Sequence, residues 1–166
     1  VGWYQTDSRN HVFQIDEICH ETNIRTEDLA RKVLSRPYKW VRYFGDPAGT
    51  STFGSGMGDI EIFKRHGMKV RYKRDKLSKN IPAGIELVRS FIENADGERK
   101  FHVDKKCVGS IEDYEAYRYP ENTGKDLKLV PEKDGLHDHG CDQLRYFFIN
   151  QFPIRSGKFQ LLNRSW

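Results

Sequence analysis

The sequence DHGCDQLRY, residues 138–146, holds the densest group of metal-ligand side chains in the chain. In a helix, Asp138 and Asp142 lie four residues apart and His139 and Asp142 three apart, so these side chains share one face. Two carboxylates with one imidazole suit a hard divalent ion such as Mg²⁺ or Mn²⁺. The pattern therefore predicts a helix over residues 138–150 that carries a candidate metal site. A plainer interpretation stays open, in which Asp138 stabilises the helix N-terminus and His139 lies on a wet surface.

Three other kinds of site use parts of this segment. His137-Asp138 matches the His-Asp pair of a helical phosphohydrolase, but that class is all-helical and this chain carries clear strand patterns. His137, His139 and Cys141 could bind zinc, but no second clustered Cys/His pair is visible to complete a structural zinc site. Cys141 beside a histidine could be a nucleophile, but nothing in the sequence marks it as activated. These interpretations rank below the Mg²⁺-type site.

Asp46 is a second candidate metal ligand, because it closely follows a predicted buried strand over residues 40–44. In open α/β sheets, ligands bind outside the C-terminal ends of the strands, which is where Asp46 falls. The surrounding sequence Gly45-Asp46-Pro47-Ala48-Gly49 is also good turn chemistry, with the aspartate as its cap. Taken alone, Asp46 is more typical of a turn cap than of a metal ligand.

The spacing of apolar and turn residues along the rest of the chain alternates between strand and helix patterns. The predicted strands cover residues 1–5, 11–19, 40–44, 68–72 and 101–103. The predicted helices cover residues 27–35, 59–66, 81–95, 111–117 and 138–150, and Thr26 is expected to cap the first of them. Residues 117–119 and 127–130 are predicted to pair as an auxiliary β-hairpin near 117–130. This order predicts an α/β fold with a mixed central sheet flanked by helices.

Residues 64–79 concentrate the positive charge of the chain. They carry eight Lys or Arg against one acidic residue, a net charge of +7, while the rest of the chain nets −3. Such a concentration on a mildly acidic body favours a polyanionic partner, most often nucleic acid, with a solvated loop as the alternative. The residues expected to bind DNA are Lys69, Arg71, Lys73, Arg74, Lys76 and Lys79.

Composition limits the classes of protein to which the chain can belong. Its 166 residues favour one domain. Charged residues make up 31%, apolar residues 37% and aromatic residues 13%, which fits a soluble globular domain and not a disordered chain. No apolar run approaches the roughly 18 residues of a membrane span and no secretion signal is visible, so no membrane partner is expected. Three cysteines without CxxC spacing indicate reduced thiols in a cytosolic protein.

Three segments, in this order, resemble the C-terminal nuclease domain of the large terminase subunit of tailed bacteriophages. The first is the strand Val41–Phe44 with Gly45-Asp46-Pro47-Ala48 after it. The second begins with Ile81–Arg89 and continues with Cys107, Ile111-Glu112 and Tyr117, which is similar to the family's "C…IxE…Y" stretch. The third is residues 138–146, close to the family's "D-[DH]-x-x-D-A-L-R-Y" closing helix. The resemblance spans essentially the whole chain.

This resemblance implies an RNase H-like fold and a metal-dependent endonuclease that cuts concatemeric double-stranded viral DNA during genome packaging. It implies that Asp46 and Asp138 are catalytic and that Asp46, Asp138, His139 and Asp142 hold two divalent ions, Mg²⁺ or Mn²⁺. The implied partners are double-stranded DNA, the portal protein, the small terminase subunit and an ATPase domain of the same polypeptide. The implied location is the host cell cytoplasm.

The sequence departs from the family pattern at two points. The family carries a first aspartate on a central strand, upstream of the strand that residues 1–5 resemble, and no residue here fills that position. We therefore expect residues 1–166 to be a single nuclease domain that is a fragment, without the ATPase domain and the first central strand. In addition, His139 stands where many members carry an aspartate.

Two alternatives belong to other functional classes. One is a catalytically silent DNA-docking module with an RNase H-like core. The other is a different RNase H-like nuclease, of the resolvase or transposase type. Metal-dependent cleavage of duplex DNA distinguishes the first from a nuclease, and indifference to DNA structure argues against a resolvase.

Overall fold

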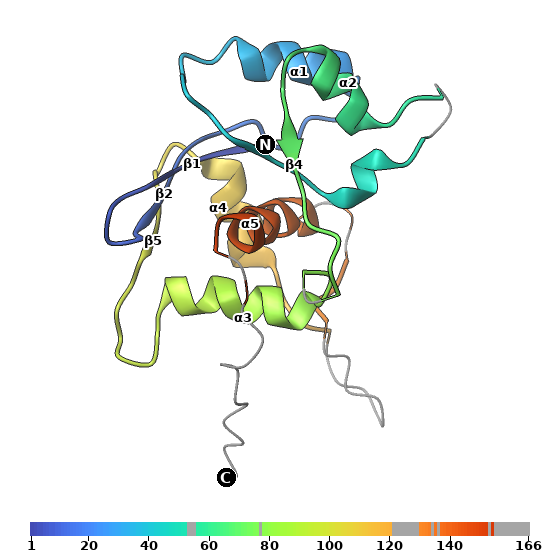
Figure 1. Cartoon of the computed structure of the whole chain (residues 1–166). Helices are drawn as coiled ribbons and strands as arrows, with labels where there is room; N and C mark the ends of the chain where they lie inside the picture. The colour runs from blue at the N-terminus through green and yellow to red at the C-terminus, as the bar shows by residue number, and fades with distance from the viewer. Residues whose placement is uncertain are drawn as a thin grey trace.

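The computed structural model describes residues 1–52, 56–76, 78–120, 130–133, 135, 137–152 and 154. Its strands are β1 (Gly2–Thr6), β2 (Val12–Glu17), β3 (Tyr43–Phe44), β4 (Val70–Arg71) and β5 (Phe101–Val103). Its helices are α1 (Thr26–Leu34), α2 (Asp59–Arg65), α3 (Ile81–Ile92), α4 (Val108–Ala116) and α5 (Asp138–Gln151), with a 3₁₀ turn, η1 (Pro47–Thr50). The chain is therefore a mixed α/β protein, as predicted (Figure 1).

The strands form two small sheets in the part of the chain that the structure describes. The first has the order β1-β2-β5, with β1 antiparallel and β5 parallel to β2. The second contains β3 and β4, which run parallel with Tyr43 opposite Val70. The predicted mixed central sheet is thus divided, and β1 and β3 are each edge strands with one described neighbour.

Helix α5 lies at the centre of the molecule, with α3 along one side and the first sheet and α4 around the others (Figure 1). Its apolar residues Leu144, Phe147 and Phe148 are buried together with Val12 of β2. Gly84 lets α3 approach closely, since a Cβ atom there would lie 2.9 Å from the Arg145 side chain. None of the described helices is long and apolar enough to cross a membrane.

A second apolar cluster packs α1 against the first sheet. Trp3 of β1, Ala30 and Val33 of α1, and Met68 just before β4 are all buried in it. This cluster positions β1 beside the segment that leads to β3, and the two together border the candidate site described below.

The prediction of a buried strand over residues 40–44 is wrong at its first half. Trp40 is 98% exposed and has a φ of 61°, in the left-handed region that no strand residue adopts. Val41 is exposed as well, and only Tyr43 and Phe44 pair with a neighbour. The apolar residue types at 40 and 41 therefore do not report burial.

The predicted cap of the first helix is also wrong. Arg25 occupies the N-cap position of α1 without a side-chain hydrogen bond. The Thr26 hydroxyl instead donates to Asp59 at the start of α2, at 2.7 Å, so it joins two helices. The predicted hairpin lies mostly outside the described residues, and residues 117–120 within them form no strand.

Candidate functional site

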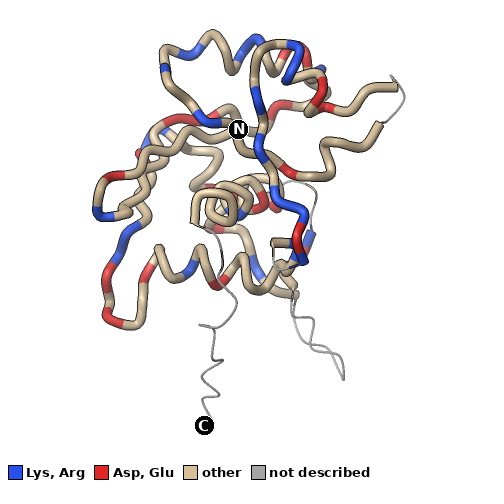
Figure 2. The backbone as a smooth tube through the Cα atoms, in the orientation of Figure 1, with Lys and Arg blue, Asp and Glu red and all other residues tan. Residues whose placement is uncertain are grey.

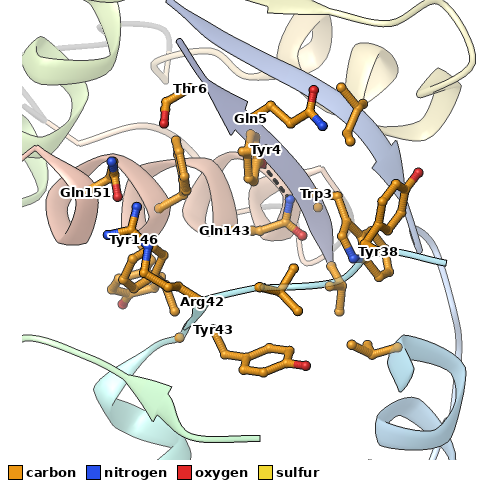
Figure 3. A pocket seen from close by; sticks show the side chains of 18 of the residues that line it. Trp3, Tyr4, Gln5, Thr6, Tyr38, Arg42, Tyr43, Gln143, Tyr146 and Gln151 are labelled. Carbon is orange, nitrogen blue, oxygen red and sulfur yellow. Dashed lines mark hydrogen bonds between the residues drawn. The ribbon is translucent and has the colours of Figure 1, made fainter. Parts of the chain in front are cut away.

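A groove of about 790 Å³ lies between β1 and the segment that leads into β3, with α5 as its floor (Figure 3). Every residue of 1–6 and of 37–46 contributes to its walls. From α5 it is lined by His139, Asp142, Gln143, Tyr146, Phe147 and Gln151. The amide of Gln143 donates to the Tyr4 hydroxyl at 2.9 Å and joins the floor to the β1 wall.

Asp46 stands at one end of this groove, directly before η1. One of its carboxylate oxygens accepts a hydrogen bond from the Ala48 backbone at 2.8 Å, so the residue does cap a turn. The carboxylate also acts on Tyr146 of α5: burial raises the pKa of that hydroxyl, Arg145 opposes the rise, and Asp46 adds to it. The turn-cap interpretation is therefore correct, and it still leaves Asp46 facing α5.

Asp142 reaches the same groove from α5 and is held in place by cations. Arg145 binds its Oδ1 atom at 2.8 Å, and Lys133 approaches its Oδ2 atom at 3.5 Å. The Arg145 side chain is buried, and its guanidinium lies 4.5 Å from the centroid of the Tyr146 ring. Burial lowers the pKa of Arg145, but the hydrogen bond to Asp142, the charge of Asp142 and the contact with Tyr146 together outweigh burial, so the pKa is raised.

Asp138 and His139, at the start of α5, lie in different surroundings. Asp138 is buried in the first turn of α5 and accepts a hydrogen bond from the Gly135 backbone at 2.9 Å, a contact to the segment before the helix and not to the N–H groups of the helix itself. His139 is exposed and lines the groove, but Asp138 does not. Three of the four predicted metal ligands, Asp46, His139 and Asp142, thus meet at one groove, and Asp138 lies outside it.

The donor types at the groove fit Mg²⁺ or Mn²⁺, because two carboxylates and one imidazole are hard or borderline ligands. Their geometry is not that of a compact ligand set. Within the described residues, Cys19, His20 and Asp113 form the one group whose three ligand atoms all lie within 4.8 Å of one another. Asp46, His139 and Asp142 are therefore an open set of donors, with room on the β1 side of the groove.

The basic segment runs from the end of α2 through β4 to the start of α3, and Figure 2 shows it as a band of blue beside the groove segment. Of the six residues predicted to bind DNA, Lys69, Arg71, Arg74, Lys76 and Lys79 are exposed. The backbone of Gly45 donates to the Arg71 carbonyl at 3.0 Å, which joins β4 to the residue before Asp46. Strand β4 and the groove are therefore immediate neighbours, and the groove itself is lined by Lys39 and Arg42 as well as by Asp46 and Asp142.

Lys73, also predicted to bind DNA, makes a contact within the fold. Its ammonium group donates to the Ile149 carbonyl of α5 at 2.9 Å and is partly buried. It neutralises the C-terminal end of that helix, where backbone carbonyls carry partial negative charge. The contact stabilises the fold, and Lys73 is removed from the set of freely exposed cations.

Sequence reasoning missed two residues that line this groove, Tyr4 and Gln143, and one beside it, Arg145. Arg145 is a partner of Asp142 that the i,i+3 spacing in a helix could have indicated. Tyr4 and Gln143 come from opposite ends of the chain, and no local pattern predicts their contact.

No family model matches the chain, and neither a curated protein nor a solved structure is significantly similar to it.

Proposed function

We propose that this chain is a metal-dependent endonuclease domain of the terminase type, with an RNase H-like fold, that hydrolyses phosphodiester bonds of double-stranded DNA. The observation that carries the proposal is the meeting of Asp46 and Asp142, from distant parts of the sequence, in one groove beside the basic strand β4. Carboxylates next to a cationic surface are the arrangement that a metal-dependent nuclease needs, because metal ions and DNA phosphates must come together there.

The groove residues have separate tasks in this proposal. Asp46 and Asp142 supply oxygen ligands and His139 a nitrogen ligand at the end of the groove. Arg145 fixes the rotamer of Asp142 through its 2.8 Å contact and so pre-positions that carboxylate. Two divalent ions held by shared carboxylates about 4 Å apart would stabilise the attacking hydroxide and the leaving alkoxide.

The space between the edge strands β1 and β3 could hold one further strand. An RNase H-like sheet is continuous, whereas β1 and β3 are edge strands on the two walls of the groove. One extended segment between them would join the two sheets and bring a further carboxylate to Asp46 and Asp142. The central strand that the resemblance implies would occupy this position between β1 and β3.

The DNA backbone is assigned to the exposed cations of β4 and its flanks, Lys69, Arg71, Arg74, Lys76 and Lys79. Their contacts with phosphate would give affinity without sequence preference. The portal protein, the small terminase subunit and an ATPase domain on the same polypeptide are partners that belong to this proposal, as does a location in the host cell cytoplasm.

A catalytically silent DNA-docking module is the second candidate, and a specific observation favours it. Both oxygens of Asp142 already face cations, and one oxygen of Asp46 caps a turn, so neither carboxylate is unused. In that case the acidic residues would shape the groove, and the chain would hold DNA without cutting it.

The test is nicking of supercoiled plasmid by the full-length gene product with Mg²⁺, Mn²⁺ or EDTA. We expect cleavage only with a metal, and a loss of about 100-fold or more in Asp46→Asn, because even indirect damage to a metal site costs roughly 10–100-fold. The matched control is Asp96→Asn, which changes an exposed aspartate away from the groove. DNA binding without cleavage under every metal condition would establish the docking module instead.

A further inference from the structure

Outside the groove, three metal-ligating side chains meet where β2 ends against α4. The Sγ atom of Cys19, a ring nitrogen of His20 and a carboxylate oxygen of Asp113 all lie within 4.8 Å of one another. Asp113 Oδ1 is 2.9 Å from His20 Nε2, and Asp113 Oδ2 is 3.6 Å from Cys19 Sγ. Two ligands of one tetrahedral zinc ion are separated by about 3.3–3.8 Å, given metal–ligand bonds of about 2.0–2.3 Å. The Cys19 contact lies within this range and the His20 contact is shorter, so the three side chains are near the spacing of zinc ligands, and a fourth ligand would complete the tetrahedron.

The surrounding structure holds these three side chains in place. Glu17, the last residue of β2, accepts hydrogen bonds from the backbone of Gly109 and Ser110, at 2.9 and 2.8 Å, and so ties the end of the strand to the start of α4. A Cβ atom at Gly109 would lie 2.8 Å from the Cys19 Cβ atom, so the absence of a side chain there permits the close approach. The ligand positions are thus fixed by contacts that do not involve the ligands' own donor atoms.

The backbone at His20 has an unfavourable conformation that the surrounding contacts hold in place. His20 has a φ of 52°, in the left-handed region that side chains other than glycine rarely adopt. Strain of this kind persists where surrounding contacts hold it, and it is concentrated at functional sites. Here it turns the imidazole toward Asp113, whose side chain is only 1% exposed.

The cluster is accessible from solvent on one side. Cys19 and His20 line a second cavity of about 790 Å³, whose charged wall residues are Asp16, Glu17, Glu21 and Glu112 together with Lys32, Arg36 and Lys106. The positive residues largely offset the negative ones, and the cavity gives a cation a path from solvent to Cys19 and His20. A further imidazole lies beside the cluster, since the His137 ring meets the His20 ring edge-on with centroids 6.5 Å apart.

We propose that Cys19, His20 and Asp113 form a zinc site that fastens the end of β2 to α4. One thiolate, one imidazole and one carboxylate are a ligand set that Zn²⁺ accepts and that Mg²⁺, which prefers oxygen, does not. Binding forms one bond from the metal to each ligand and releases the Cys19 thiol proton to solvent. Cys19-His20 is a clustered Cys/His pair outside residues 137–141, of the kind that the search for a structural zinc site did not identify. The proposal is independent of the nuclease function.

The test is metal binding by the purified chain, free of any metal-binding tag, with Zn²⁺ and Co²⁺ as probes. After dialysis we expect about one Zn²⁺ per chain by elemental analysis, and thiolate-to-cobalt charge-transfer absorption with Co²⁺. Cys19→Ser should abolish that absorption and weaken Zn²⁺ binding by about 100-fold or more, since loss of a supporting partner alone costs roughly 10–100-fold. Zn²⁺ should also raise the thermal unfolding midpoint of the wild type and not of this variant.

Cys107→Ala and His66→Ala are the matched controls, because both residues lie outside the cluster. His20→Ala provides a second ligand variant at a partly exposed position, in case Cys19→Ser does not fold. A wild-type chain that retains no Zn²⁺ and gives no cobalt–thiolate absorption would overturn the proposal. Equal losses in Cys107→Ala and Cys19→Ser would overturn it as well.

Discussion

Gln14 is fully buried on β2, and its side-chain amide has a partner at each end. The amide nitrogen donates to Ser110 at 2.7 Å, and the Tyr114 hydroxyl donates to the amide oxygen at 2.8 Å. In the described residues, no buried side-chain nitrogen or oxygen lacks a partner. Since an unsatisfied buried polar group costs its full desolvation, this network between β2 and α4 is a sensitive point of the fold.

Tyr114→Phe tests that network. The change keeps the ring and removes the donor to Gln14, so we expect a loss of about 1–3 kcal/mol in the free energy of unfolding. Urea denaturation measures it as a lower midpoint at unchanged slope. Tyr119→Phe is the matched control, because Tyr119 is exposed and its ring lies beside Arg89 with or without the hydroxyl. Equal stability of the two variants would show that the Gln14 contact contributes nothing.

His139→Asp tests the nitrogen ligand of the groove. An imidazole favours Mn²⁺ relative to a set of carboxylates, whereas an added carboxylate favours Mg²⁺ and increases the negative charge. We expect the wild type to cleave plasmid faster with Mn²⁺ than with Mg²⁺, and the variant to narrow or reverse that ratio. An identical metal ratio in both proteins would mean that His139 faces only solvent.

The basic segment, residues 64–79, has one role in the fold and one in the proposed DNA binding, and a comparison of Lys73 with Arg71 separates the two. Lys73→Ala removes a charged hydrogen bond to the Ile149 carbonyl, and we expect a loss of about 1.5–3 kcal/mol in stability. Arg71→Ala changes an exposed side chain, so stability should stay within about 0.5 kcal/mol. Thermal and urea denaturation of both variants measure the difference, and equal stability would contradict the assignment of Lys73 to the fold.

DNA affinity gives the complementary measurement on the same segment. Replacing Lys69, Arg71 and Lys76 together by Gln should weaken binding about equally for unrelated sequences. Each lost phosphate contact should reduce the slope of log K against log salt by about 0.9. Fluorescence anisotropy over a salt series measures this slope, and an unchanged slope would return the segment to the solvated-loop interpretation.

Elements with local signals could be predicted from the sequence. Pro82 in the first turn marks the start of α3. In the structure Asn80 is the N-cap residue, and its side-chain oxygen accepts a hydrogen bond from the Ala83 backbone at 3.1 Å. The strand at 101–103 is confirmed residue for residue, and α5 extends one residue beyond the predicted 138–150. The strand at 40–44 was overestimated because residue type does not reveal the positive φ of Trp40.

Contacts between residues that are distant in the sequence could not be predicted from local patterns. Asp46 and Asp142 were recognised individually, but their meeting in one groove depends on how β3 packs against α5. The sequence does not indicate Cys19-His20 as part of a site, because Asp113 reaches the pair only through the contact between β2 and α4. Long-range juxtaposition of this kind is set by tertiary packing, so spacing along the chain cannot reveal it.

In the proposed function, the groove between β1 and β3 binds the divalent metal through Asp46 and Asp142. The most direct measurement is paramagnetic broadening of backbone amide signals by Mn²⁺, in a chain first loaded with Zn²⁺ so that the Cys19–His20–Asp113 cluster is filled. We predict that the amide signals of residues 45, 46, 48 and 139–143 broaden first and that those of residues 94–98 persist. Asp46→Asn should weaken the effect. Broadening that spares the groove, or that is unchanged in this variant, would contradict the claim.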